Sequence, residues 1–362
     1  MKRKHVGIEA GRPLIFGTGL IALDVVVTET GELFSATGGT CGNVMAILSY
    51  MGWISRPVAR IGLDKAAKAI ISDLALWGVD LSSISIRPLV KTPIIVEKLR
   101  RDSNGIPFHT FSFSCPNCNR RFPGYQPVPL KSLTPMERAP SMEVLFLDRA
   151  SPPALALARR ATEVGAVVVF EPPRMREDKN FLALLKLAHI VKYSHDRIDQ
   201  LDLPNDSSAL LEIQTLGRGG ARFRTELGSS GDGWHHVEAK PVARMVDSAG
   251  CGDWFTAGLI SSLCSEGMSS LKRAGDSDIL GALDLAQSLA AWNCSFAGPR
   301  GGMYTPALKN INAIFNARQS NLHLRSKLSP PDLDLGIYKV CGDCREKPKR
   351  MSLRPERRSV GT

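Results

Sequence analysis

The stretch VDSAGCGDWFTAG, Val246–Gly258, sets glycines and small residues directly before an apolar run of helical character. Glycines let a backbone approach a ligand closely, and the first N–H groups of a helix have no partner within it, so such a turn can bind an anion. Asp253 in this turn suits a base that removes a proton from a hydroxyl as that hydroxyl attacks a phosphate. A tight turn with an aspartate N-cap accounts for the same residues equally well.

Length and composition indicate a protein with a sizeable core. Hydrophobic residues make up 43% of the 362 residues, and no window approaches the run of about 18 apolar residues that a membrane span needs. The basic N-terminus lacks the apolar stretch of a secretory signal. Eight cysteines without an export signal are typical of a reducing compartment, so we expect a cytoplasmic protein with no membrane contact.

Short apolar runs alternate with segments of helical spacing over much of the chain. The sequence predicts buried strands at residues 14–19, 58–61, 144–147, 166–170, 190–193 and 211–215. It predicts helices at residues 43–51, 65–77, 154–164, 181–188, 255–264 and 279–294. Such alternation favours an α/β fold with a parallel sheet covered by helices on both faces.

Other regions depart from this alternation. Residues 24–37 and 92–113 alternate apolar with polar side chains and could form a small separate sheet. Residues 114–135 are rich in proline, cysteine and arginine, which indicates an insertion. Residues 316–362 form a C-terminal extension whose basic tail carries part of the net charge of +11. Because no aromatic residue is interleaved in that tail, a solvated end is favoured over nucleic-acid binding.

Five motifs, taken in order, resemble those of the PfkB/ribokinase family of carbohydrate and nucleoside kinases. Val246–Gly258 is similar to the C-terminal signature of that family, with Ser248 and Cys251 in place of the usual residues. The other four motifs are the first strand GLIALD (Gly19–Asp24), the N-terminal signature GGTCGNVMAILSYMG (Gly38–Gly52), its continuation RIGLDKAA (Arg60–Ala67) and the nucleotide-binding TLGRGGA (Thr215–Ala221). The resemblance implies a ribokinase-like fold, a doubly wound, mainly parallel sheet in a kinase domain of residues 13–315, with the small sheet as a β lid.

The resemblance also implies roles for particular residues. Asp253 would be the catalytic base, and the backbone N–H groups of three neighbours would form the anion hole: Gly250, Cys251 and Gly252. The residues that would bind the nucleotide are Thr215, Gly217, Gly220 and Gln287. The residues that would hold the acceptor are Asp24, Gly39 and Asn43. Asp247 corresponds to a position that helps to bind a monovalent cation such as K⁺ in some relatives.

One motif of the family is altered in this chain. The family has an N-x-x-E motif that is linked to magnesium and phosphate, and Ser194 and Arg197 occupy its Asn and Glu positions here, with Asp196 beside them. Magnesium could still arrive with ATP and be held through water, because Mg²⁺ keeps several waters by preference. We therefore expect ATP with Mg²⁺ as the cofactor and leave the protein contacts of the metal open.

Two C-x-x-C pairs, Cys115–Cys118 and Cys341–Cys344, have the spacing of zinc knuckles. Their flanking sequences, FSCPNCNRRFP and YKVCGDCREKP, are similar to the two halves of a zinc ribbon. We expect all four thiolates to hold one structural Zn²⁺. Two unrelated pairs of reduced thiols, or a redox pair, are the alternatives.

Taken together, these features predict an ATP-dependent kinase that phosphorylates a hydroxyl on a sugar or sugar-like small molecule. A nucleoside kinase is the alternative on the same fold. A non-catalytic nucleotide-binding protein, which would use the zinc module and the basic tail for partners, is an alternative of a different class. Asp253 argues for catalysis, whereas Ser194 and Arg197 keep the non-catalytic alternative open. A homodimer through the lid is a further expectation.

Overall fold

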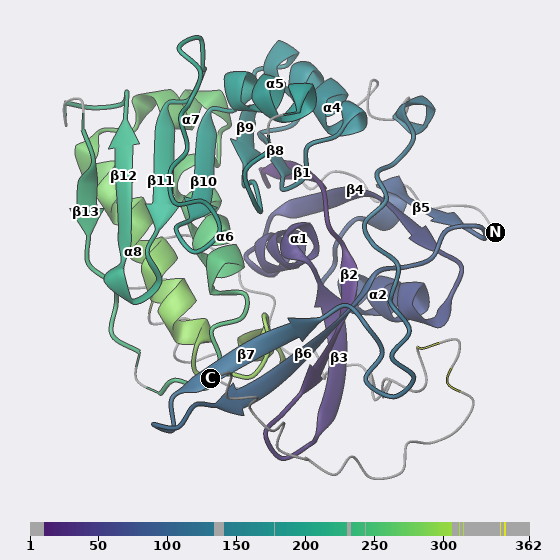
Figure 1. Ribbon diagram of the computed structural model, residues 1–362. Helices are drawn as coiled ribbons and strands as arrows, with labels where there is room; N and C mark the ends of the chain where they lie inside the picture. Colours follow the sequence, from purple (N-terminus) through teal and green to yellow (C-terminus); the bar gives the residue numbers. More distant parts are fainter. Residues whose placement is uncertain are drawn as a thin grey trace, which may run out of the picture.

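The computed structural model describes residues 11–133, 141–176, 178–229, 233–242 and 244–305, with the single residues 311, 314, 341 and 344. The predicted basic tail lies outside these residues. Two sheets organise the described chain, a large one flanked by helices and a small one at its lower end in the view of Figure 1. Within the described residues, no helix is both long enough and apolar enough to cross a membrane.

Nine strands of the described chain form the large sheet, in the order β13-β12-β11-β10-β9-β8-β1-β4-β5. Their bounds are β1 Leu14–Thr18, β4 Ile54–Gly62, β5 Ile84–Arg87, β8 Val144–Leu147, β9 Val167–Phe170, β10 Ile190–Ser194, β11 Leu211–Thr215, β12 Ala221–Thr225 and β13 His235–Val237. Neighbours from β11 through β5 are parallel, whereas β12 and β13 add antiparallel pairs at one edge. The carboxyl ends of the parallel strands therefore share one edge, where open α/β sheets bind ligands.

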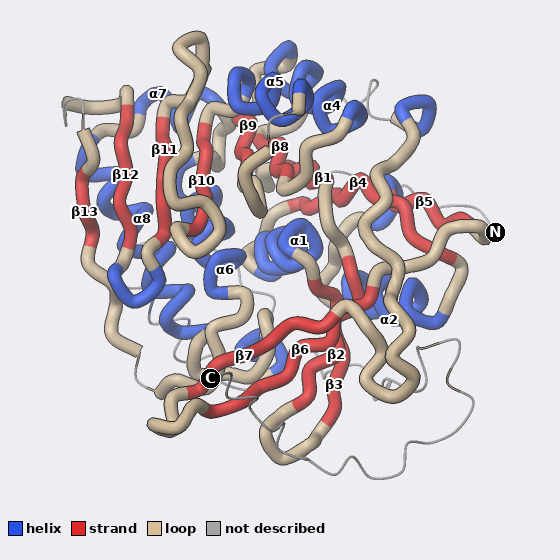
Figure 2. Tube along the Cα trace, in the orientation of Figure 1, coloured by secondary structure: helices blue, strands red, loops and turns tan. Residues whose placement is uncertain are grey.

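Helices cover both faces of the large sheet (Figure 2). Their bounds are α1 Thr40–Tyr50, α2 Lys65–Leu76, α4 Pro152–Glu163, α5 Lys179–Leu187, α6 Cys251–Leu263, α7 Met268–Arg273 and α8 Asp276–Asn293. Alternate residues of β8 enter opposite cores: Phe146 packs with α1, α6 and α8, whereas Leu145 packs with α4 and α5. Burial on both faces explains the unbroken apolar runs of the strands. The doubly wound α/β fold predicted from the sequence is confirmed.

The small sheet has the order β3-β2-β6-β7, with bounds β2 Ala22–Val27, β3 Leu33–Gly38, β6 Ile94–Arg101 and β7 Pro107–Ser112. Strands β2 and β6 are parallel, and each also has one antiparallel neighbour. These strands lie in or next to the two regions where apolar and polar residues alternate in the sequence. Helices α1 and α2 pack against β3, which fixes the small sheet beside the large one.

Helix α6 begins earlier than the sequence predicts. Its first residue is Cys251, not Phe255, so Asp253 lies inside the first helical turn. In the turn before the helix, Gly250 has a left-handed conformation, with φ 71° and ψ −4°. A β-carbon at Gly250 would lie 2.2 Å from the carbonyl oxygen of Pro299, so glycine is required here for both backbone conformation and space.

Candidate active site

Asp253 is a buried carboxylate at the N-terminal end of α6, with only 9% of its surface exposed. Its Oδ2 accepts a hydrogen bond of 2.7 Å from Nδ2 of Asn43, on α1. Burial, with the charge of Glu171 adding to it, raises the pKa of Asp253 to about 7, although Asn43 and the cationic side chains nearby lower it. A carboxylate with this pKa can exchange a proton near neutral pH, as a general base must.

The orientation of Asn43 is fixed by a buried arginine that no sequence motif marks. Arg300 Nε donates to Asn43 Oδ1 at 3.1 Å, which leaves the Asn43 amino group to face Asp253. Arg300 Nη2 also donates to the carbonyl oxygen of Thr37 and to Oδ2 of Asp73, both at 2.6 Å. The chain of contacts from Asp73 to Asp253 therefore joins α2, α1 and α6 at the site.

Asp24, on β2, is a second buried carboxyl close to Asp253. Burial raises the pKa of Asp24 to about 7, with the charge of Arg300 lowering it and the charge of Asp253 raising it further. The backbone N–H of Gly39 donates to this carboxyl, and Gly38 packs so closely that a β-carbon there would meet it at 1.8 Å. Among the described residues, Asp24 Oδ1 is buried without a hydrogen-bond partner. An acceptor hydroxyl would satisfy that oxygen.

The structure thus brings the three predicted acceptor residues to the predicted base. Gly39 has φ 75°, and a β-carbon on it would lie 2.5 Å from the carbonyl oxygen of Leu20. This close approach explains the double glycine that precedes α1. The N–H of Cys251 donates to the carbonyl oxygen of Ser248 at 3.3 Å, so this member of the predicted anion hole already has a partner.

A buried ion pair that the sequence motifs do not include lies beside the same helix turn. Lys192, on β10, donates from Nζ to Oε1 of Glu171 at 2.6 Å and to the carbonyl oxygen of Gly252 at 3.1 Å. The other carboxylate oxygen of Glu171 accepts from the hydroxyl of Thr256 at 2.6 Å. A lysine within an apolar strand, and an acid directly after the preceding strand, are the signals that could have pointed to this pair.

The altered motif lies at the end of β10. The carbonyl oxygen of Ser194 accepts from the N–H groups of Arg197 and Ile198, at 3.0 and 2.9 Å, which forms a turn. Arg197 is exposed, and its positive charge acts to lower the pKa of Asp253. The position where the family carries an acid therefore presents a positive charge toward Asp253.

The predicted nucleotide residues fall into two kinds. Thr215 ends β11, and Gly217 follows it with φ 58° and open space where a β-carbon would be, so its backbone can meet a ligand. Gly220 instead packs on the sheet, because a β-carbon there would lie 2.1 Å from the carbonyl oxygen of Val237. Gln287, on α8, is buried, and its Nε2 is without a hydrogen-bond partner in the described chain. An unpaired buried amide beside α6 fits a contact with a nucleotide base.

Asp247 lies just before the turn that leads into α6. Its Oδ1 accepts from the N–H of Ala249 at 3.0 Å, and its Oδ2 accepts from the N–H of Gly298 at 2.8 Å. His109 Nδ1, from β7, lies 3.0 Å from Oδ1. Burial and the charge of Asp247 raise the pKa of Glu97, on β6, to about 11, so that carboxyl is neutral. The sequence alone does not connect Glu97 or His109 with Asp247.

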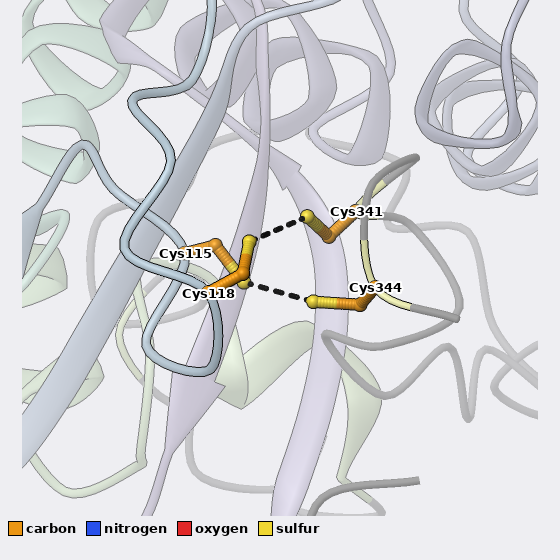
Figure 3. A group of neighbouring side chains, drawn as sticks. All are labelled: Cys115, Cys118, Cys341 and Cys344. Carbon is orange, nitrogen blue, oxygen red and sulfur yellow. Dashed lines mark hydrogen bonds between the residues drawn. The ribbon is translucent and has the colours of Figure 1, made fainter. Parts of the chain in front are cut away.

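Four cysteines from distant parts of the chain form one cluster (Figure 3). The sulfur of Cys115 lies 3.5 Å from that of Cys344, and the sulfur of Cys118 lies 3.6 Å from that of Cys341. All four sulfur atoms lie within 4.8 Å of one another. The two predicted C-x-x-C pairs therefore meet.

A doubly wound sheet with a second small sheet, and a buried carboxylate in a glycine-led helix turn, are features expected of ribokinase-like small-molecule kinases. A family model described as pfkB family carbohydrate kinase matches residues 136–305. A fructokinase from Salmonella typhimurium is 25% identical over 269 residues, which cover 69% of this chain and 84% of that protein. Both findings support the resemblance of this chain to the PfkB/ribokinase family.

Two solved structures show the same fold. A nucleoside kinase from Burkholderia thailandensis in complex with inosine has a TM-score of 0.60 and 17% identity, over 84% of this chain and 97% of that one. A fructokinase double mutant from Vibrio cholerae O395, bound to fructose, ADP and a potassium ion, has a TM-score of 0.62 and 21% identity, over 84% of this chain and 98% of that one. At these identities the likeness concerns the fold.

Proposed function

We propose that this protein transfers the terminal phosphoryl group of ATP to a hydroxyl of a sugar or sugar-like small molecule. The observation that carries the proposal is the buried Asp253, held by Asn43 in the first turn of α6 and close enough to a second buried carboxyl, Asp24, for its charge to raise the pKa of Asp24. A hydroxyl held by Asp24 would lie beside a base whose pKa is close to neutral. Both parts of an alcohol phosphorylation, positioning and proton removal, then come from this chain.

Each group has a defined part in this proposal. Asp253 accepts the proton of the attacking hydroxyl. The N–H groups of Gly250 and Gly252 face the transferring group at the positive end of the helix, where they stabilise negative charge. Asp24 and Gly39 hold the acceptor. Arg300 acts through Asn43 and is a positioning residue, because it touches the amide and not the reacting atoms.

ATP supplies the phosphoryl group, with Mg²⁺ to neutralise its phosphates. Thr215 and Gly217 would bind the nucleotide backbone, and Gln287 its base. Both carboxylate oxygens of Glu171 are engaged, by Lys192 and Thr256, which argues for a magnesium ion held largely through water. Arg197 would then meet the phosphate charge directly, in the place where the family uses an acid.

We also propose a monovalent cation near Asp247. Support comes from the resemblance of the signature, from the buried carboxylate just before α6, and from the potassium ion bound in the Vibrio cholerae fructokinase structure. Potassium would act by fixing the turn that carries Gly250. Replacing K⁺ by Na⁺ in the assay is expected to lower turnover, and an unchanged rate would contradict this role.

A nucleoside acceptor is the second candidate, favoured by the fold likeness to a nucleoside kinase that binds inosine. A ribose hydroxyl would present the same chemistry to Asp24 and Asp253. Side chains of the small sheet would then decide between a free sugar and a nucleoside, because they border the acceptor.

A homodimer through the small sheet is a further proposal. β7 is an edge strand, and three phenylalanines on or just after it are exposed: Phe108, Phe111 and Phe113. A second copy would cover these rings. Sedimentation analysis of the wild type and of Phe111→Glu tests this: a dimer that becomes monomeric is expected, and a monomeric wild type contradicts it.

The proposed function is tested by measuring ATP consumption against a panel of sugars and nucleosides. We expect one class of acceptor to raise the rate well above the acceptor-free background, and Asp253→Asn to remove that increase. The product should carry phosphate on a hydroxyl, as read by mass spectrometry and phosphorus NMR. ATP binding without acceptor-dependent turnover across the panel would favour the non-catalytic alternative.

A further inference from the structure

We propose that Cys115, Cys118, Cys341 and Cys344 bind one Zn²⁺ ion as a closed tetrathiolate site, which holds the C-terminal segment to the loop after β7. The proposal stands apart from the kinase chemistry, because none of the four cysteines is among the residues that the proposed phosphoryl transfer uses.

The spacing of the sulfur atoms matches a tetrahedral metal site. With Zn–S bonds of about 2.3 Å, two sulfurs at corners of a tetrahedron lie about 3.8 Å apart. Two of the separations here are 3.5 and 3.6 Å. A disulfide would need about 2.05 Å. Each short separation joins a sulfur of one C-x-x-C pair to a sulfur of the other, so the cluster is a single four-sulfur group and not two separate dithiols (Figure 3).

The first pair sits in a loop whose backbone already has the shape of a metal knuckle. The N–H of Asn119 donates to the carbonyl oxygen of Cys115 at 2.8 Å, and the N–H of Cys115 donates to the carbonyl oxygen of Arg120 at 2.9 Å. Asn119 has φ 57°, the only positive φ of a non-glycine residue in the described chain. This left-handed residue turns the chain back, which brings both sulfurs to one side.

Backbone N–H groups of the same loop point at the sulfur atoms. Those of Asn117 and Cys118 donate to the sulfur of Cys115, and that of Arg120 donates to the sulfur of Cys118. Such donors stabilise thiolate ligands and orient them around a metal. Four thiolates with Zn²⁺ leave a net charge of −2, and the adjacent Arg120 and Arg121 offset it. With four protein ligands the ion has no open position for substrate, which makes the site structural.

The second pair docks on the body of the protein. Cys341 is buried and Cys344 is half-buried, and the N–H of Cys344 donates to the carbonyl oxygen of Cys341 at 3.3 Å. Cys115 and Cys341 are part of the same hydrophobic core as α1, α6 and α8. A metal would link the two pairs directly, in addition to this packing.

Metal analysis of the full-length protein, purified under reducing conditions after growth with added zinc, tests the proposal. We expect about one zinc per chain, as a closed Cys₄ site requires. Cys118→Ser and Cys341→Ser, one from each pair, should lose the zinc. Cys264→Ala, a buried cysteine outside the cluster, is the matched control and should keep it. Far-ultraviolet circular dichroism checks that each variant is folded.

A second measurement covers the case in which a serine variant does not fold. A mercurial reagent that modifies the thiols of the wild-type protein should release zinc from the cluster. A chromogenic zinc chelator measures the zinc that is released. Wild-type protein without stoichiometric zinc, zinc retained in both folded serine variants, or iron in place of zinc would overturn the proposal. These measurements do not depend on enzyme activity. A failure of the zinc proposal can therefore be told apart from a failure of the kinase assignment.

Discussion

Arg300 and Asn43 lie 257 positions apart in the chain, yet the guanidinium Nε donates to the amide oxygen at 3.1 Å. This contact sets which end of the amide faces Asp253, because an amide that accepts at its oxygen must present its amino group on the other side. The carboxylate of Asp253 therefore receives a hydrogen bond that favours its ionised form. A buried arginine remote in sequence thus tunes the proposed base.

Asp253→Asn is expected to lower turnover by about 10²–10⁴-fold, because the base acts in the transition state. ATP affinity should stay near that of the wild type, since the carboxylate contributes little to ground-state binding. Turnover with a confirmed acceptor and ATP binding by calorimetry provide the two measurements. In the wild type, kcat/KM should fall as the pH drops below about 7, where Asp253 takes up a proton. A variant as active as the wild type would end the assignment.

The same substitution is expected to stabilise the fold at alkaline pH. The pKa of Asp253 is about 7 in the folded protein and 3.8 as a free group. A carboxyl whose pKa is raised by folding contributes stability that is fully present below its unfolded pKa of 3.8 and is lost as the pH rises through its folded pKa of about 7. Asparagine does not ionise, so the Tm of Asp253→Asn minus that of the wild type should grow as the pH rises from 3.8 to about 7 and level off above it. A Tm difference that is flat with pH would contradict the burial argument.

Arg300→Lys is expected to reduce kcat by up to about 10²-fold, because a lysine cannot hold Asn43, Thr37 and Asp73 together in one plane. The acid limb of the pH profile should also move to higher pH, since a misoriented Asn43 no longer favours the ionised Asp253. That shift separates positioning from a general loss of stability, which would lower the amount of active protein without moving the profile. Tyr304→Phe, which removes a different partner of Asp73, serves as the control and should leave the profile in place.

Asp24→Ala is expected to raise KM for the acceptor on the order of 10- to 100-fold, as the loss of hydrogen bonds to a charged group would do. KM for ATP should change little, because Asp24 lies on β2 of the small sheet, whereas Thr215 ends β11 of the large sheet. Initial-rate kinetics with each substrate varied in turn provide the comparison. Equal effects on both constants would show that Asp24 is a structural residue of β2.

Arg197→Glu restores an acid at the family position and reverses the charge that faces Asp253. We expect weaker ATP binding and a lower kcat, with a smaller loss in Arg197→Gln, because the proposed role is positive charge beside the phosphates. Titrating magnesium in both variants is the accompanying measurement. An increase in the activity of Arg197→Glu at limiting magnesium would contradict this role. It would show that Arg197 impairs magnesium use at this position and does not replace the function of the acid.

Much of the fold could be predicted because strands such as β8 are buried on both faces and therefore appear as short unbroken apolar runs. The sequence does not predict strands β12 and β13. They lie at an edge of the sheet, where polar residues such as Arg222 and His236 alternate with apolar ones, so they contain no unbroken apolar run. The sequence predicts the start of α6 four residues late, because the glycines resemble a longer turn. Only Gly250 has the left-handed conformation that ends the turn.

Some residues of the candidate site could be predicted from the sequence, and others could not. Asp253 could be proposed from the glycine turn before it, and Asn43 and Asp24 because they fall in motifs that resemble those of the PfkB/ribokinase family. Arg300 and Lys192 could not, because a buried charge is recognised only when its partners from other elements are known. The four cysteines were the exception among long-range contacts, since the C-x-x-C spacing marks each half separately.

The contact between Cys115 and Cys344 spans 229 positions, so the last ligand of the cluster is synthesised long after the first. The large sheet, the small sheet and α8 are all complete in the chain before the second pair exists, and domains generally fold as they emerge. If the cluster binds zinc as proposed, metal capture is the last step of folding and not its nucleus. Zinc shortage would then leave the two sheets able to fold without the ion, in contrast to small zinc fingers, whose folding begins only when the ion binds.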